Sequence, residues 1–282
     1  MKVVATIAAV RAARPELGRL GLVPTMGFLH AGHLALAAQA RAECEAVAVS
    51  IFVNPSQFGP NEDLARYPRD MEHDLALLEA GGVDLVFVPA VNEMYPAGFT
   101  TWVDVEQLSA PLEGAHRPGH FRGVATVVCK LLNIMMPERV YFGAKDAQQT
   151  VVVRRMVSDL ALPSEVVVVP TVRETDGLAL SSRNIYLDPA QRQAAGILYR
   201  ALTAGRQAWL AGECNAQALR QLMVAMITAE PLAQIDYVSL AEPETLVELD
   251  AVADRALASL AVRFGTTRLI DNLIWERRAA AW

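Results

Sequence analysis

Short apolar runs alternate with longer segments of helical period along the first two thirds of the chain. Runs such as AVAVSIFV and EVVVVP are apolar almost throughout, which is typical of strands buried on both faces of a parallel sheet. The pattern predicts strands at Gly21–Thr25, Ala46–Val53, Asp84–Val88, Arg139–Phe142 and Glu165–Pro170. It predicts helices between them at His33–Glu45, Arg69–Ala80, Arg122–Met136 and Asp146–Leu160. This alternation favours an α/β fold built on a doubly wound parallel sheet.

The pattern changes after Asp188. A helix is predicted over residues 189–212, with Asp188 as its N-cap, and a second helix at Asn215–Ala229. Three strand-like runs follow, IDYVSL, ALASLAVRF and TRLIDNLI. We therefore predict a smaller α+β C-terminal domain, and we divide the chain into residues 1–175 and residues 176–282.

The composition provides ample material for a core. Of 282 residues, 53% are hydrophobic and 20% are charged, which argues against a disordered chain. The formal net charge is −6, from 25 basic and 31 acidic side chains. A surface that neutralises many phosphates needs excess lysine and arginine. The balance therefore argues against a nucleic-acid-binding protein, but it leaves room for a pocket that binds one nucleotide.

The cysteines and the longest apolar runs indicate in which cellular compartment the protein is expected. Cys44, Cys129 and Cys214 are odd in number and form no CxxC pair, so a disulfide framework and a cysteine-rich zinc site are both disfavoured. No apolar stretch approaches the roughly 18–20 residues that a membrane-spanning helix needs. The first ten residues weakly resemble a signal peptide, but Arg11 ends the run and no small-residue cleavage site follows. We expect a cytoplasmic protein without a membrane partner.

The densest group of chemically informative residues is PTMGFLHAGHLAL, which follows a predicted strand and begins a predicted helix. Gly27 and Gly32 lack Cβ atoms, so the backbone there can approach a ligand closely. His30 and His33 share one face of a helical turn, where they and the free N–H groups of the helix start can bind a phosphate. The alternative is a turn with two surface histidines. A zinc site is disfavoured because the glutamate of HExxH is missing, and neither GxGxxG nor GxxxxGK[ST] occurs.

A second polar group follows the next predicted strand, in FVNPSQF. Asn54 and Gln57 each offer donor and acceptor atoms, which suits a substrate that carries hydroxyl and carboxylate groups. Ligands of doubly wound sheets bind at the carboxyl ends of strands, so the location favours a binding role. Taken alone, the segment is equally typical of an Asn-Pro turn.

Two further segments are expected to be loops with basic side chains. LEGAHRPGHFRGV, residues 112–124, is either a basic loop that covers a polyphosphate or a solvated loop. LALSSRN places two hydroxyls beside a guanidinium, at Ser181, Ser182 and Arg183. Such a set can hold phosphate oxygens as they rearrange, although the SSR triplet alone is uninformative.

The segment YFGAKDAQQ again follows a predicted strand and begins a helix. Lys145 supplies a compact positive charge suited to a phosphate. Asp146 can cap the helix, which is a structural role. Gln149 lies three residues further on and faces the same side.

Taken in order, these segments resemble the pantoate–β-alanine ligase (pantothenate synthetase) family. PTMGFLHAGH is similar to the HIGH-type motif of the nucleotidylyltransferase superfamily, and LSSRN stands where that superfamily has its KMSKS-like loop. The full set, with FVNPSQF, LEGAHRPGHFRGV and YFGAKDAQQ, is specific to the family, and the chain length also fits. The resemblance implies a Rossmann-like N-terminal domain, a smaller C-terminal domain that closes over the ATP site, and a homodimer.

The resemblance also implies a reaction. ATP and (R)-pantoate form pantoyl adenylate and pyrophosphate, and β-alanine then attacks the adenylate to give pantothenate and AMP. Mg²⁺ is required and is bound mainly through the ATP phosphates, with no metal site assigned to protein residues. No nucleic acid takes part.

The resemblance assigns residue roles by position. His33 matches the catalytic proton donor, and we expect His30 and Lys145 to act with it on the phosphates. The ATP-binding positions are Met26, Gly27, Phe28, Leu29, His30, Ala31, Gly32, His33, Gly143, Ala144, Lys145, Asp146, Val172, Leu180, Ser181, Ser182 and Arg183. The positions that match pantoate- and β-alanine-binding residues, or lie near them, are Gln57, Gln149 and Asn54.

Three positions depart from the family pattern. Ala144 replaces the glutamate of GEKD, Ala147 replaces the phenylalanine of KDFQQ, and Leu180 replaces the methionine of MSSR. The first two leave Lys145 unchanged, and leucine is close to methionine in volume. We therefore expect activity to persist.

Two other functions fit the residues less well. An adenylyl- or cytidylyltransferase of the same superfamily would share HxGH but lack FVNPSQF and the Gln148–Gln149 pair. A non-catalytic nucleotide- or RNA-binding module is disfavoured by the acidic balance. The retention of His30, His33 and Lys145 argues against it as well.

Overall fold

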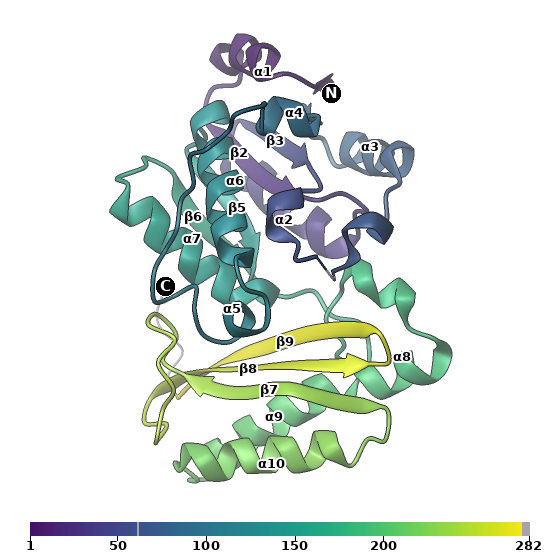
Figure 1. The fold of residues 1–282 in the computed structure, drawn as a ribbon, viewed down its shortest axis with the longest axis vertical. Coiled ribbons are helices and arrows are strands. Elements are labelled where there is room, and N and C mark those ends of the chain that lie inside the picture. Colours follow the sequence, from purple (N-terminus) through teal and green to yellow (C-terminus); the bar gives the residue numbers. More distant parts are fainter. Residues whose placement is uncertain (61, 278–282) are drawn as a thin grey trace. The chain divides into compact units, whose positions relative to one another are not determined.

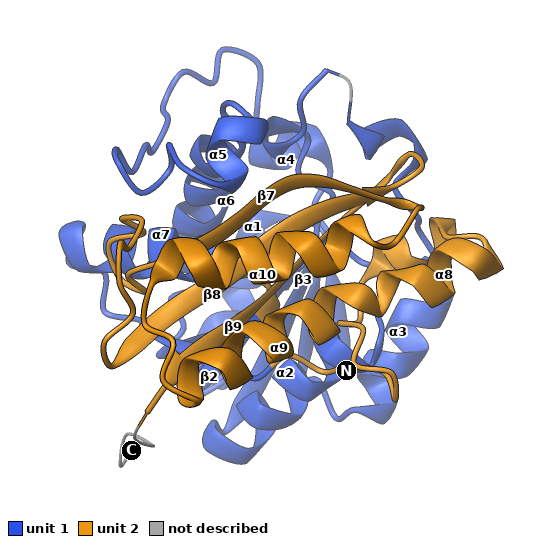
Figure 2. Cartoon of the chain, turned by 90° about the horizontal axis from the view of Figure 1, so that it is seen from below, with its two compact units in different colours: residues 1–144, 148–170 blue, residues 145–147, 171–282 orange. Residues whose placement is uncertain are grey.

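The computed structural model describes residues 1–60 and 62–277. The chain forms two compact units, Met1–Ala144 with Gln148–Pro170, and Lys145–Ala147 with the described residues from Thr171 onward (Figure 2). The first unit contains a six-stranded sheet and the second a three-stranded sheet.

All strands of the larger sheet are parallel, in the order β1-β4-β3-β2-β5-β6 (Figure 1). They are β1 Lys2–Val4, β2 Leu20–Thr25, β3 Ala46–Ile51, β4 Leu85–Phe87, β5 Arg139–Gly143 and β6 Glu165–Val169. Every residue of β3 is buried, which explains its continuous apolar run. The predicted doubly wound parallel sheet is confirmed. The edge strand β1 escaped prediction because three residues are too few to show a period.

The connections of the first unit are mostly helical. They are α1 Ile7–Ala13, α2 Ala31–Glu43, α3 Met71–Ala80, α4 Val91–Met94, α5 Glu113–His116, α6 His120–Met135 and α7 Ala147–Asp159, with 3₁₀ turns η1 Arg14–Glu16, η2 Pro55–Gln57, η3 Asp63–Arg66 and η4 Ala144–Asp146. Leu36 and Ala40 of α2 and Leu78 of α3 share one core with Val23 and Val47 of the sheet. This packing holds α2 and α3 against the strands. Within the described ranges, no helix has the length and apolar character needed to cross a membrane.

The second unit packs helices against an antiparallel sheet. Its strands are β7 Ala233–Ala241, β8 Arg255–Phe264 and β9 Thr267–Glu276, and its helices are α8 Pro189–Ala195, α9 Ile197–Leu210 and α10 Ala216–Thr228, with a 3₁₀ helix η5 at Ser182–Tyr186. The rings of Trp209 in α9 and Trp275 in β9 stack with centroids 5.9 Å apart in the core. Figure 2 shows α9 and α10 along one face of this sheet. The predicted smaller α+β unit is therefore present.

One predicted helix is divided in two. The sequence predicted one helix over residues 189–212, whereas α8 and α9 are separated at Gly196. The Gly196 amide bonds to Ala194 O, which closes a turn tighter than that of an α-helix. Glycine is the poorest helix former after proline, so the break falls there. The predicted N-cap Asp188 accepts a hydrogen bond from the Gln191 amide at 2.8 Å.

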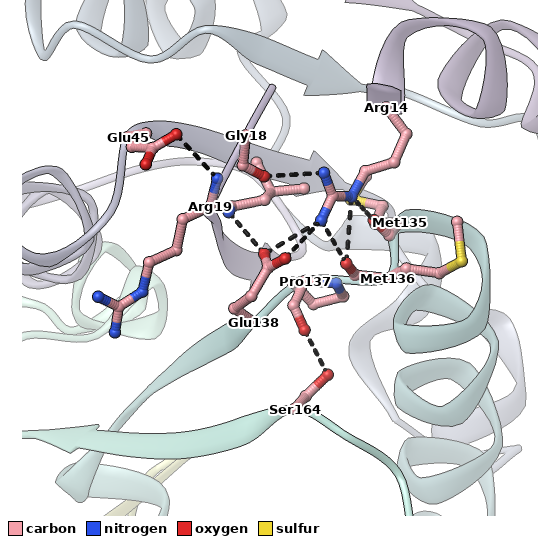
Figure 3. A network of polar contacts seen from close by, with 10 residues as sticks. Arg14, Gly18, Arg19, Glu45, Met135, Met136, Pro137, Glu138 and Ser164 are labelled. Carbon is pink, nitrogen blue, oxygen red and sulfur yellow. Dashed lines mark hydrogen bonds and ion pairs between the residues drawn. The ribbon is translucent and has the colours of Figure 1, made fainter. Parts of the chain in front are cut away.

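A polar network closes the amino-terminal edge of the parallel sheet (Figure 3). The Arg14 guanidinium donates to three carbonyl oxygens at 2.7–2.9 Å, those of Gly18, Met135 and Met136. It also donates to both carboxylate oxygens of Glu138 at 3.0 Å. Glu138 in turn accepts a hydrogen bond from the Leu20 amide at 2.7 Å, where β2 begins. The network thus joins the start of β2 to the end of α6 and the start of β5.

Candidate functional site

Three of the predicted groups follow strands that lie side by side in the sheet. Met26–His33 follows β2, Asn54 and Gln57 follow β3, and a segment that begins at Gly143 follows β5 (Figure 1). The strands β3, β2 and β5 are neighbours, and all three run parallel. Their carboxyl ends therefore meet at one edge, the edge at which ligands of such sheets bind.

The loop between β2 and α2 is a tight turn held by a buried carboxylate. Gly27 (φ +81°) and Phe28 (φ +51°) both have left-handed backbone conformations. Asp74 of α3 accepts hydrogen bonds from the amide of Phe28 at 2.8 Å and from that of Leu29 at 2.7 Å. Only 1% of Asp74 is exposed. The carboxylate therefore fixes the two residues that precede His30.

His30 and His33 form the first turn of α2. His30 is the N-cap, and its Nδ1 accepts a hydrogen bond from the Gly32 amide at 3.1 Å. The His30 amide donates to Nδ1 of His33 at 3.3 Å, and the ring centroids lie 4.1 Å apart. A Cβ atom on residue 32 would lie 2.8 Å from Cε1 of His30. Glycine at this position therefore makes room for the capping ring.

These hydrogen bonds set the tautomer of both rings. A neutral imidazole that accepts at Nδ1 carries its proton on Nε2, so His30 and His33 each present an Nε2–H donor. The sequence predicted free backbone N–H groups here, but the Gly32 amide serves the cap and the His33 amide donates to His30 O at 2.9 Å. The imidazoles, rather than these two amides, are the donors suited to a phosphate.

Asn54 and Gln57 form a buried amide pair after β3, with 1% and 9% of each residue exposed. Asn54 Nδ2 donates to Gln57 Oε1 at 3.0 Å and to Gly123 O at 3.2 Å, and its Oδ1 accepts from the Tyr95 hydroxyl at 2.9 Å. Gln57 Nε2 donates to Met26 Sδ at 3.4 Å, and sulfur is a weak acceptor. Asn54 is therefore placed to orient Gln57, while the Gln57 amide nitrogen is suited to a ligand.

The basic segment 112–124, which was expected to be a loop, contains the short helix α5 and the start of α6 and is anchored at Arg117 and His120. Arg117 donates to both carboxylate oxygens of Glu62, at 2.8 and 2.7 Å. His120 is buried, with Nδ1 2.9 Å from Gln57 O and Nε2 3.1 Å from Arg117 Nη1. Because a guanidinium can only donate, Nε2 accepts and Nδ1 donates. Burial, followed by the charge of Arg117, lowers the pKa of His120 from 6.5 to about 4, so the ring is neutral at pH 7.

The Gln148–Gln149 pair has two different environments. Gln148 is buried, and its Oε1 accepts from the Glu113 amide at 3.0 Å. Its Nε2 donates to Leu108 O and Pro111 O at 2.9 and 2.8 Å. Gln149 is half-buried, and its side-chain amide has no hydrogen-bond partner within residues 1–60 and 62–277. Gln148 thus holds the preceding loop.

Lys145 and Asp146 lie in η4, which starts at Ala144 directly after Gly143 ends β5. Lys145 Nζ lies 3.9 Å from Asp146 Oδ1, a looser contact than a hydrogen bond. The Lys145 side chain is 19% exposed, and its backbone carbonyl accepts from Asn272 Nδ2 at 2.7 Å. The backbone of Lys145 is thereby tied to β9.

Val172 and Leu180 pair across a hairpin of the second unit. The Leu180 amide donates to Val172 O at 3.0 Å. Arg173 fixes the hairpin to β9 through two hydrogen bonds to the Asp271 carboxylate, at 2.7 and 2.9 Å. Asp271 is 1% exposed, so the anchor is buried. Val172 and Leu180, two of the predicted ATP-binding positions, are therefore held next to each other.

The predicted Ser181–Arg183 triplet begins η5. Ser181 is its N-cap, and its Oγ accepts from the Arg183 amide at 3.2 Å. Ser182 is buried and Arg183 is half-buried. The cap sets the backbone that carries the guanidinium, which is a structural use of the first hydroxyl.

Sequence reasoning assigned no role to several residues that shape this site. Asp74 resembles an ordinary acidic residue in the first turn of a helix, and His120 lies in a segment that allowed two interpretations. One signal was present in the pattern: Asp74 is four residues before Leu78, so a charge falls on the apolar face of α3. The Tyr95 contact with Asn54 has no such signal, because it joins distant segments.

Comparison with known proteins identifies the family. The chain matches the family described as Pantoate-beta-alanine ligase over residues 2–274. It is 65% identical over 277 residues to the pantothenate synthetase of Roseiflexus castenholzii, covering 98% of this chain and 100% of the relative. It is 57% identical over 280 residues to that of Moorella thermoacetica, covering 98% and 99%.

Solved structures agree with this match. The pantothenate synthetase of Thermus thermophilus superposes with a TM-score of 0.94 at 54% identity, over 97% of this chain and 99% of that one. The pantoate-beta-alanine ligase of Francisella tularensis, complexed with beta-gamma ATP and beta-alanine, gives 0.79 at 33% identity over 97% of each chain. The resemblance read from the motifs is confirmed, and the chain belongs to the pantoate–β-alanine ligase family.

Proposed function

We propose that the chain uses ATP to condense (R)-pantoate with β-alanine, forming pantothenate. The observation that carries this proposal is the pair of Nε2–H donors on His30 and His33, which follow β2. The Gln57 amide follows β3, the strand next to β2 in the sheet. The donors suit phosphoryl oxygens, and the amide suits the hydroxyl and carboxylate groups of a small acid. Family membership supports the same reaction, as does the Francisella relative complexed with beta-gamma ATP and beta-alanine.

The reaction consists of two displacements. A carboxylate oxygen of pantoate attacks the α-phosphorus of ATP, a new P–O bond forms, and pyrophosphate leaves with the electrons of the broken bond. The β-alanine amine then attacks the acyl carbon of pantoyl adenylate and a C–N bond forms. The acyl C–O bond to the phosphate breaks, AMP leaves with the electrons of that bond, and the proton of the amine passes to solvent water. Both steps change the charge on phosphoryl oxygens, so fixed donors lower their barriers.

The proposed ATP contacts come from four segments: Met26–His33, Gly143–Asp146, Val172 and Leu180–Arg183. Within them, His33 acts as proton donor, and His30 and Lys145 stabilise the phosphate charge. The tautomers support hydrogen bonds from both rings to phosphate oxygens, because a neutral imidazole with a proton on Nε2 can donate one.

In this scheme, Mg²⁺ would be bound mainly by oxygen atoms of the ATP phosphates. In the described part of the chain, no group of three or more His, Cys, Asp or Glu side chains could hold a metal ion. Mg²⁺ commonly takes phosphate oxygens of a substrate and water as most of its ligands. Bound in this way, it would neutralise the departing pyrophosphate.

Gln57 and Gln149 are assigned to pantoate, and Gln57 also to β-alanine, with Asn54 orienting the Gln57 amide. Residues 1–175 would bind nucleotide and pantoate, and residues 176–282 would close over ATP. A homodimer and a cytoplasmic location complete the proposal. Family resemblance supports the dimer, and the use of ATP supports the location.

Pyrophosphate–ATP exchange tests the function directly. The protein is incubated with ATP, Mg²⁺ and labelled pyrophosphate, with β-alanine left out, and (R)-pantoate is either present or absent. Reversible adenylation predicts that label enters ATP only when both pantoate and Mg²⁺ are present. Exchange without pantoate, or with another acid in its place, would contradict the proposed substrate.

A second measurement separates the ligase from a nucleotidylyltransferase. Addition of β-alanine should convert the exchanging enzyme to net turnover, with AMP and pantothenate formed in equal amounts. A nucleotidylyltransferase would instead release a nucleotide-containing product. Failure to form AMP would therefore exclude the second displacement.

A further inference from the structure

Asp74 is a buried carboxylate that the reaction scheme above does not use. It lies in the first turn of α3, and only 1% of it is exposed. Oδ2 accepts from the Phe28 amide at 2.8 Å, and Oδ1 accepts from the Leu29 amide at 2.7 Å. A buried charge needs such partners, because burial without them carries a large penalty. Both oxygens of the carboxylate are thus engaged by two consecutive amides of the β2–α2 loop.

The loop needs an anchor at this point. Phe28 has φ +51°, a conformation that residues other than glycine rarely adopt, and Leu29 beside it is buried. Gly27 also has a left-handed conformation, and a Cβ atom there would lie 3.0 Å from Oδ2 of Asp74. The carboxylate thus packs directly against the turn. Without its two acceptors, the turn would leave buried amides without partners.

The anchored residues lead directly into the histidine pair. Leu29 precedes His30, whose ring is held by the Gly32 amide and whose own amide bonds to His33. A shift of the Leu29 backbone would therefore move the His30 amide and its contact with His33 Nδ1. That contact is already long, at 3.3 Å, so a small displacement would break it.

We propose that Asp74 is a positioning residue that sets the location and tautomer of His30 and His33 through the backbone of the β2–α2 loop. The proposal rests on the proposed function for its kinetic consequences. Each carboxylate oxygen already accepts an amide hydrogen and the side chain is buried, so Asp74 acts through the loop and not by contact with substrate.

Asp74→Asn is the sharpest test, because it replaces one acceptor oxygen with a donor and changes little else. Displacement of catalytic groups by about 1 Å can cost roughly 10²-fold. We therefore expect kcat for pantoate-dependent exchange to fall by about 10–100-fold, with KM for pantoate changed by less than about twofold. Glu72→Gln is the matched control. It removes a charge from the same turn at an exposed position and should leave kcat unchanged.

Nitrogen-15 spectra of the imidazoles supply a readout that needs no substrate. In the unsubstituted protein, His30 and His33 should both show protonated Nε2 and unprotonated Nδ1. In Asp74→Asn the two rings should show a mixture of tautomers, while the signals of His120 stay in place. This readout does not depend on turnover. If the proposed reaction were shown to be wrong, the spectra would therefore still test whether Asp74 positions the two histidines.

Amide hydrogen exchange covers the case in which the variant does not fold. In the unsubstituted protein, the Phe28 and Leu29 amides should be protected against exchange. Free exchange at both, or unaltered histidine spectra and kcat in a folded Asp74→Asn protein, would overturn the proposal. A fall in kcat with unaltered histidine spectra would also overturn it, because the loss would then have another cause.

Discussion

The two edges of the parallel sheet both use a carboxylate to hold the backbone near β2, but in different surroundings. At the amino-terminal edge, Glu138 accepts from the Leu20 amide. At the carboxyl edge, Asp74 accepts from the amides of Phe28 and Leu29. The side chain of Glu138 is 47% exposed, whereas Asp74 is 1% exposed. The hydrogen bonds of the buried carboxylate therefore face less competition from water.

The edges also differ in how their donors are used. Every nitrogen of the Arg14 guanidinium bonds to the chain, chiefly to carbonyl oxygens. At the carboxyl edge, His30 and His33 are held through Nδ1 and each carries a proton on Nε2. Substitutions at the first edge should therefore change stability, and those at the second should change activity.

The largest expected effect is at the carboxyl edge. His33→Ala removes one positioned donor, and such a loss typically lowers kcat by about 10²–10³-fold. The free energy of unfolding should fall by only about 1 kcal/mol, because His33 also caps the His30 amide. Pyrophosphate–ATP exchange and urea denaturation on the same samples measure the two effects.

His33→Gln sharpens this result. Glutamine at the third helical position can retain the cap, but it cannot act as a proton donor. Recovery of most of the activity would show that His33 contributes a hydrogen bond rather than a proton. Near-wild-type exchange in His33→Ala would contradict the assignment of the edge itself.

The next largest effect concerns how a histidine at the carboxyl edge makes the stability of the protein depend on pH. The pKa of His120 is lowered from 6.5 to about 4 in the folded protein, so the unfolded chain binds the proton more tightly. The contribution of His120 to the free energy of unfolding is fully present above pH 6.5 and is lost as the pH falls to about 4. At about 1.36 kcal/mol per pKa unit, the loss is about 3 kcal/mol. His120→Gln should remove this part of the pH dependence. If plots of the free energy of unfolding against pH ran parallel for the two proteins between pH 4 and 7, this role of His120 would be refuted.

A smaller effect is expected at the amino-terminal edge. Arg14→Ala leaves three carbonyl oxygens and Glu138 without their main donor, at a cost of about 2 kcal/mol in the free energy of unfolding. Because the network lies at the opposite edge from the histidine pair, exchange activity should stay within about twofold of wild type. Arg11→Ala, an exposed change in the adjoining helix α1, is the control and should change neither quantity.

The smallest effect concerns Glu138 in acid. Burial raises the pKa of Glu138, but the Leu20 amide and the Arg14 guanidinium outweigh this and hold the pKa below its usual 4.5. Its contribution is therefore present above about pH 4.5 and is lost as the pH falls below that value. Glu138→Gln should lower stability at pH 7 by under about 1 kcal/mol, because the side chain is half exposed. The difference should shrink as the pH falls below 4.5, and a constant difference there would count against this account.

Much of the fold and part of the candidate site could be predicted from the sequence. The fully apolar run of β3 and the alternation of strands with helices report burial on both faces, which is a local property of the chain. The break at Gly196 was missed because a single glycine inside a helical pattern is often tolerated. The structural role of Gln148 was not predicted either, because it depends on distant carbonyl groups.

The sequence by itself determined the class of fold, the family and the segments in which chemistry is expected, since motifs and periodicity are properties of neighbouring residues. The tertiary structure alone decided which atoms of those segments are used. His30 and His33 carry their protons on Nε2 because of a helix cap. Asn54 supports Gln57, and Asp74 holds a loop that precedes it by some 45 residues. These outcomes depend on hydrogen bonds between segments far apart along the chain, and local pattern carries no information about which donor meets which acceptor.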